Sequence, residues 1–84
     1  MKIEIILKSK EKETEKDFMR LLESDAMNGD AEVVGHNPLR VYVASSKFEN
    51  VEAETLPKFA RNLIVKEITK KLQREGFETE VSLI

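Results

Sequence analysis

The sequence has no cysteine and no tryptophan, and it has one histidine, three glycines and two prolines. Without cysteine there is no disulfide framework, no thiol nucleophile and no cysteine-based zinc or iron–sulfur site. One histidine excludes every metal site that needs several imidazoles. No apolar run approaches the roughly 18 residues of a membrane span, and Met1 leads into a strand-like pattern rather than a signal peptide. We therefore expect a cytoplasmic protein that holds no metal and no cofactor.

The length and composition indicate one small folded unit. The 84 residues are 40% hydrophobic and 36% charged, with a net charge of −2, whereas typical domains have about 100–150 residues. A chain this short buries about 60–65% of its unfolded surface and has a small margin of stability. Packing against a second copy is a common way to add stability. We expect a single domain over residues 1–84 that forms a homodimer.

The first part of the chain predicts a strand followed by a helix. Residues 2–8 alternate between apolar and mostly charged side chains, which is typical of a half-buried strand. A helix is predicted over residues 14–28, because Thr14 and Asp17 resemble a capping box and an Asn-Gly pair follows as a stop. The apolar residues of this helix recur at helical spacing: Phe18, Leu21, Leu22 and Ala26.

Two short strands are predicted next, near residues 31–36 and 39–45. Asn37 and Pro38 favour a reversal of the chain between them, since proline has no N–H to donate to a sheet. In the second strand, apolar side chains alternate with Arg40, Tyr42 and Ala44. These two segments are expected to form a hairpin.

The second half of the chain predicts one more long helix. Residues 46–55 leave two interpretations open: a loop with a helical turn, started by a capping box at residues 46–49, or a ragged extra strand. We favour the loop. The helix begins near Thr55, with Pro57 in its first turn, and ends before Gly76.

The last segment, residues 77–84, alternates again and predicts a terminal strand. The order is then strand, helix, strand, strand, helix, strand. Right-handed crossovers combine two such split βαβ units into one four-stranded antiparallel sheet with both helices on one face. The prediction is an α+β protein with the ferredoxin-like βαββαβ arrangement and strand order 4-1-3-2. This arrangement is shared by enzymes, chaperones, regulators and RNA binders, so it does not select a function.

The strand alternation also predicts which side chains face the helices. The helix-covered face is expected to carry Ile3, Ile5, Leu7, Val33, Leu39, Val41, Val43, Val81 and Leu83. The opposite face is expected to carry Lys2, Glu4, Ile6, Lys8, Glu32, Val34, His36, Arg40, Tyr42, Ala44, Glu78, Glu80 and Ser82.

Three apolar residues on the helix-free face, Ile6, Val34 and Tyr42, lie on neighbouring strands. Apolar side chains bordered by charge are typical of a contact surface. They also have high strand propensity, which is an alternative reason for their presence on a solvated face. The contact hypothesis assigns partner binding to five residues: Ile6, Val34, His36, Arg40 and Tyr42.

The second helix has two apolar groups and an excess of positive charge. Leu56, Phe59 and Leu63 point about 150° away from the group around Ile68 and Leu72, so one core-facing stripe does not explain both. Either the first turns pack under residues 46–55, which we favour, or part of the helix meets another chain.

A nucleic-acid interface is the alternative function. It would use seven cations: Arg40, Lys58, Arg61, Lys66, Lys70, Lys71 and Arg74. We expect the helical cations to be dispersed around the helix, and cations late in a helix also complement its dipole. RNA-recognition motifs carry stacking aromatics and glycine in their third strand, whereas here only Tyr42 is available for stacking.

Catalytic groups are scarce. Acylphosphatases of this fold need a glycine-rich, anion-binding loop after the first strand, and the corresponding residues 9–13 contain no glycine and two glutamates. His36 lies in a predicted turn, where polar residues are ordinary. Glu78 and Glu80 are expected on the solvated side of one strand. The sequence therefore predicts a small, non-enzymatic binding or regulatory module that acts through protein–protein contact on the helix-free sheet face.

Overall fold

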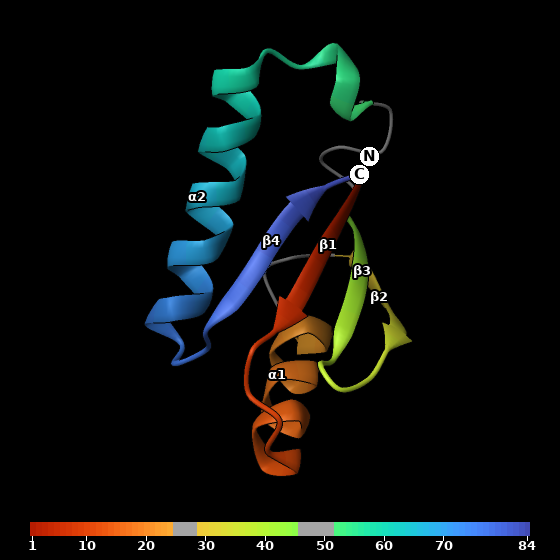
Figure 1. Cartoon of the computed structure of the whole chain (residues 1–84), viewed down its shortest axis with the longest axis vertical. Helices are drawn as coiled ribbons and strands as arrows, with labels where there is room; N and C mark the ends of the chain where they lie inside the picture. The colour runs from red at the N-terminus through yellow and green to blue at the C-terminus, as the bar shows by residue number, and fades with distance from the viewer. Residues whose placement is uncertain (25–28, 46–51) are drawn as a thin grey trace.

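The structure, a computed structural model, describes residues 1–24, 29–45 and 52–84 (Figure 1). Its elements are, in chain order, β1 (Lys2–Leu7), α1 (Lys12–Ser24), β2 (Gly29–Gly35), β3 (Arg40–Ser45), the short 3-10 helix η2 (Ala53–Thr55), α2 (Lys58–Arg74) and β4 (Thr79–Leu83).

The four strands form one antiparallel sheet in the order β2-β3-β1-β4. This is the predicted order read from the opposite edge, and it confirms the ferredoxin-like α+β arrangement. Leu22 of α1 and Leu72 of α2 are buried in the same apolar cluster as Ile5 of β1. Both helices therefore cover the same face of the sheet, and Figure 1 shows α2 running beside β4 and α1 near the far end of β1.

The core follows the predicted alternation. The strand residues of the buried cluster are Ile3, Ile5, Leu7, Val41 and Val43, with Leu39 just before β3. Val81 and Leu83 of β4 are partly buried against them. The helix-side contribution includes Phe18, whose ring meets that of Phe77 edge-on at a centroid distance of 5.3 Å. Such edge-to-face contacts stabilise a core beyond the area that they bury.

Helix α1 begins two residues earlier than predicted. Thr14 lies inside the first turn rather than at the cap, so the predicted capping box is wrong. The Glu15 amide donates to the Glu11 carbonyl at 3.0 Å, and the glutamates at positions 13 and 15 lie near the positive end of the helix dipole. The predicted end near Asn28 lies outside the described residues, and Gly29 is the first residue of β2 rather than part of a helix stop.

Helix α2 begins later than predicted, at Lys58, with Pro57 as its N-cap residue. The residues just before it form the 3-10 turn η2, and the predicted capping box at residues 46–49 lies outside the described residues. The predicted end is confirmed. Gly76 has φ +93°, and the Phe77 amide donates to the Leu72 carbonyl at 2.9 Å. This is a Schellman motif, which needs a left-handed residue after the last helical turn.

Candidate binding surfaces

The helix-free face of the sheet presents alternating apolar and charged side chains in rows across the strands. In one row, Tyr42 of β3 lies between Glu4 of β1 and Glu32 of β2. In the next row, Ile6 of β1 lies between Arg40 of β3 and Glu80 of β4. Ile6 and Tyr42 are therefore diagonal neighbours, still within reach of one another for large side chains.

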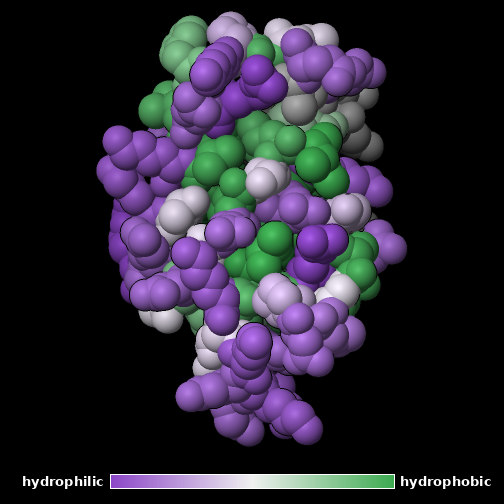
Figure 2. Space-filling model, in the orientation of Figure 1, coloured by the Kyte–Doolittle hydropathy of each residue, from purple (hydrophilic) through white to green (hydrophobic). Residues whose placement is uncertain are grey.

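One ion pair connects these two rows. The guanidinium Nε of Arg40 lies 3.8 Å from Oε2 of Glu4, and the two side chains are 49% and 19% exposed. Arg40 is the cross-strand neighbour of Ile6, and Glu4 is that of Tyr42. The ion pair therefore lies next to both of these half-buried apolar residues. In Figure 2, hydrophobic areas over the strands are accordingly bordered by hydrophilic ones.

A β-bulge in β2 decides where Val34 lies. Val33 pairs with Val41, but the next pair is Gly35 with Arg40, so Val34 is an extra residue on this edge strand. At such a bulge two residues oppose one residue of the partner strand. Val34 thus adjoins Arg40 and is 39% exposed. Ile6, Val34, Arg40 and Tyr42 are brought together on three neighbouring strands.

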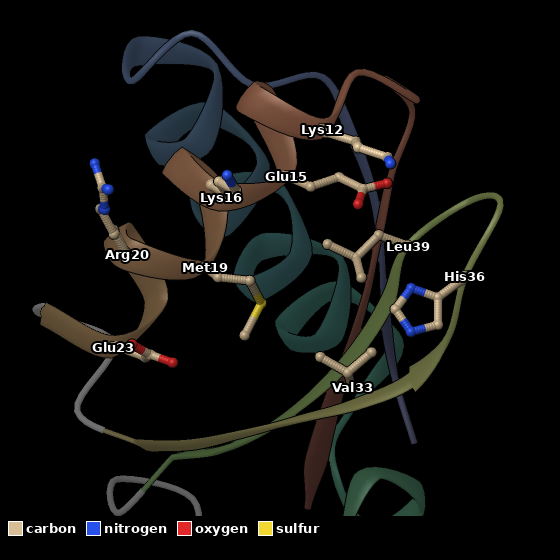
Figure 3. Close-up of a pocket in the computed structure, with 9 residues that line it drawn as sticks. All are labelled: Lys12, Glu15, Lys16, Met19, Arg20, Glu23, Val33, His36 and Leu39. Carbon is tan, nitrogen blue, oxygen red and sulfur yellow. The ribbon is translucent and has the colours of Figure 1, made fainter.

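The same bulge removes His36 from this surface. After the extra residue, the side chains of β2 alternate between the two faces with a shift of one position. His36 therefore lies on the face that the helices cover and not on the helix-free face. It lines a pocket of about 490 Å³ together with side chains of α1, including Lys16 and Met19. Figure 3 shows His36 beside Leu39, on the wall opposite α1. The predicted placement of His36 on the helix-free face is therefore wrong.

The pocket itself is a shallow depression between α1 and the β2–β3 hairpin. Its apolar floor is formed by Met19, Val33 and Leu39, whose side chains point toward one another in Figure 3. Val33 lies on the predicted face, but it is 40% exposed, because it lines this open depression. The rim residues are mostly charged: Lys12, Glu15, Lys16, Arg20 and Glu23.

The cations of α2 are dispersed around the helix as predicted, although three of them share one stripe. Lys66, Lys70 and Arg74 follow one another at intervals of four residues and are all exposed. At about 100° per residue they share one stripe of the helix. Arg61 lies on the opposite, half-buried side, while Lys58 lies at the start of the helix.

The outward stripe of α2 also carries two apolar residues. Phe59 is 74% exposed and Leu63 is 55% exposed. Residues 59, 63, 66, 70 and 74 are spaced by three or four, so they form one continuous row that points away from the sheet. The prediction that these first turns pack under residues 46–55 concerns residues 46–51, which lie outside the described residues. Among the described residues, the side chains of Phe59 and Leu63 are exposed. The i, i+4, i+7 spacing that marks this row was available in the sequence.

Arg40 and the cations of α2 lie on opposite sides of the molecule. Arg40 is on the helix-free face, whereas α2 covers the other face and turns its exposed row outward. The sheet and the helix layer separate them. One nucleic-acid strand would have to wrap around the protein to contact both groups.

The described residues hold no group of three or more His, Asp or Glu side chains arranged to bind a metal ion. In the same part of the chain, every helix is too short or too polar to cross a bilayer. Comparisons with protein-family models, with curated proteins and with solved structures found no match to this chain.

Proposed function

We propose that this protein is a non-enzymatic binding module that acts through the helix-free face of its sheet, with a second copy of the chain as its first partner. The observation that carries the proposal is the cluster of Ile6, Val34 and Tyr42 on an uncovered face, with the Arg40–Glu4 ion pair beside it. Apolar side chains at the centre and charged ones around them are the usual anatomy of a protein interface.

The charges of this face favour self-association over binding to a partner whose surface is strongly positive or strongly negative. The face carries both cations and anions: Lys2, Lys8, Arg40, Glu4, Glu32, Glu78 and Glu80. In a two-fold dimer each copy presents the same patch, so a surface with both signs is able to pair with itself. The charged rim then sets the register, while the apolar centre contributes most of the affinity.

Replacing the central aromatic residue tests the proposal. Tyr42→Asp places a carboxylate between Glu4 and Glu32. Three neighbouring carboxylates repel one another, and an interface that removes their water is therefore destabilised. We expect the wild-type chain to have the mass of a dimer in light scattering at micromolar concentration, and Tyr42→Asp to have the mass of a monomer. Circular dichroism verifies that the variant is folded.

Phe59→Asp is the matched control. It makes the same change of an exposed aromatic residue to a carboxylate, but on α2, far from the sheet face. This variant is expected to remain a dimer. A monomeric wild-type protein, or an equal loss of mass in both variants, would contradict the proposed interface.

Nucleic-acid binding through α2 and Arg40 has less support, because the structure separates these groups. The two functions differ in their response to salt. Phosphate-driven affinity falls linearly with the logarithm of salt concentration, whereas an apolar sheet contact changes little. A dimer that persists between 50 mM and 500 mM salt is the result that we expect.

A further inference from the structure

The outward row of α2 is the most exposed apolar surface among the described residues. Phe59 and Leu63 are 74% and 55% exposed, more than any other large hydrophobic residue described. They are four positions apart on one helix, so their side chains are neighbours. Single exposed apolar residues are ordinary on a protein surface, but an adjacent aromatic–aliphatic pair on a helix is a common anchor for a partner.

Three cations continue the row toward the C-terminal end of α2. Lys66, Lys70 and Arg74 are exposed and lie one turn apart. Within the described residues none of the three forms an ion pair, whereas Lys16, Arg20 and Arg40 each do. Glu67 is also exposed and borders the same stripe, so this half of α2 carries three cations and one anion. The row is therefore polarised, with an apolar half followed by a half of net positive charge, called the cationic half. Together, residues 59, 63, 66, 70 and 74 are named the α2 row.

We propose that the α2 row binds an acidic amphipathic segment of a partner protein. Apolar side chains of the segment would cover Phe59 and Leu63, and its carboxylates would pair with Lys66, Lys70 and Arg74. The row is about 22 Å long, at about 1.5 Å per residue, which matches a helix of about 16 residues. An antiparallel helix fits best, since its acidic first turns then lie at its own N-terminus, where negative charge is favoured.

Other occupants fit the row less well. A membrane-bound helix needs apolar side chains along its whole length, whereas here they occupy one end only. A single-stranded nucleic acid needs several stacking platforms beside its cations, and Leu63 offers none. A second copy that met the row with its own α2 row would set cations against cations or against apolar side chains, which leaves the charges without partners. The proposal is independent of the sheet-face dimer.

The probe is a synthetic helical peptide of about 16 residues. It carries three Glu on one face of its first half and two Leu on the same face of its second half. The control peptide has Lys at the three Glu positions. We expect the full-length protein to bind the acidic peptide with a Kd below about 100 µM in a fluorescence-anisotropy titration, and the control peptide at least about tenfold more weakly.

Substitutions in the two halves of the row test it separately. Lys70→Glu is expected to weaken binding of the acidic peptide by about tenfold, and the pair Phe59→Gln with Leu63→Gln by about tenfold or more. Lys10→Glu makes the same charge change in the exposed loop after β1 and is expected to leave the affinity within about twofold. These exposed positions are expected to change neither the circular dichroism nor the oligomeric mass.

Failure of the acidic peptide to bind more tightly than the control peptide would overturn the proposal. Equal affinities of the wild type and Lys70→Glu would do the same. Oligouridylate and vesicles containing phosphatidylserine are titrated in parallel. If either one binds through Phe59 and Lys70 while the peptide does not, the row has a different occupant and the proposed one is wrong.

Discussion

In the part of the chain that the structure describes, Thr79 is the one polar side chain buried with the apolar core. It lies at the start of β4, opposite Leu7, and is 8% exposed. Among the described residues no group forms a hydrogen bond with its hydroxyl oxygen. A buried hydroxyl without a partner loses its hydration on folding and gains nothing in exchange.

We expect Thr79→Val to stabilise the protein. Valine has the same branched shape and a higher strand propensity, and it lacks the unsatisfied hydroxyl. The expected gain is about 1 kcal/mol in the free energy of unfolding, or a rise of about 4–8 °C in Tm for a chain of this size. Thermal unfolding followed by circular dichroism measures it.

Thr69→Val is the control for Thr79→Val, because it makes the same substitution at a threonine whose hydroxyl has a hydrogen-bond partner. The Thr69 hydroxyl donates to the Val65 carbonyl oxygen at 2.7 Å within α2. Its removal therefore takes away a satisfied hydrogen bond, and no gain in Tm is expected. A lower Tm for Thr79→Val would show that the Thr79 hydroxyl has a partner in solution.

At the scale of the element, the end of α2 depends on one backbone conformation. Gly76 has φ +93°, and its amide donates to the Gln73 carbonyl at 3.0 Å. The turn brings Phe77 back onto Leu72, and both side chains are buried. This contact between the residues on either side of the cap connects α2 to β4.

Gly76→Ala is expected to destabilise the protein by about 1 kcal/mol, because an L-residue is strained at positive φ. No atom lies within 4 Å of the added Cβ, so the cost comes from the backbone and not from a clash. Gly76→Asn serves as the comparison, since asparagine tolerates this conformation better. Urea denaturation should rank the three proteins as Gly, Asn, Ala in decreasing stability. Equal stability of all three would mean that the cap contributes nothing.

The bulge in β2 affects both the exposed edge of the sheet and the faces on which the following side chains lie. An exposed edge strand can pair with a neighbouring molecule, and a bulge interrupts such pairing. The extra residue, Val34, also changes which side chains share a face beyond it. Because of this residue, Gly35 pairs with Arg40, and His36 lies on the side of the sheet that faces α1.

At the scale of the whole molecule, the core is small. Among the described residues, ten hydrophobic side chains are buried, and the chain has a radius of gyration of 12.3 Å. A core of this size leaves a modest free energy of unfolding, so an interface with a second copy would add a noticeable fraction of the total.

Dimer formation therefore predicts a stability that depends on concentration. If only the folded chain dimerises, Tm is expected to rise by about 3 °C or more for each tenfold increase in protein concentration while the dimer forms. Differential scanning calorimetry at several concentrations measures this shift. The monomeric Tyr42→Asp variant should show a constant Tm. A constant Tm for the wild type would count against self-association.

The sequence by itself determined the element order and most of the sheet faces. Alternation in residues 2–8 and 39–45 identified the buried side chains, because a strand sends successive residues to opposite faces. From this alternation, the open-face positions of Ile6, Arg40 and Tyr42 were predicted correctly. The stop of α2 at Gly76 was predictable because glycine is the residue best suited to positive φ.

Only the tertiary structure decided the position of His36 and which side of α2 stays exposed. A bulge arises from the pairing of two strands, so nothing within residues 31–36 specifies the extra residue at Val34. Likewise, α2 carries apolar residues on two sides, and docking against the sheet buries Leu72 while leaving Phe59 exposed. Local patterns set which residues share a side of an element, but long-range packing chooses which side is covered.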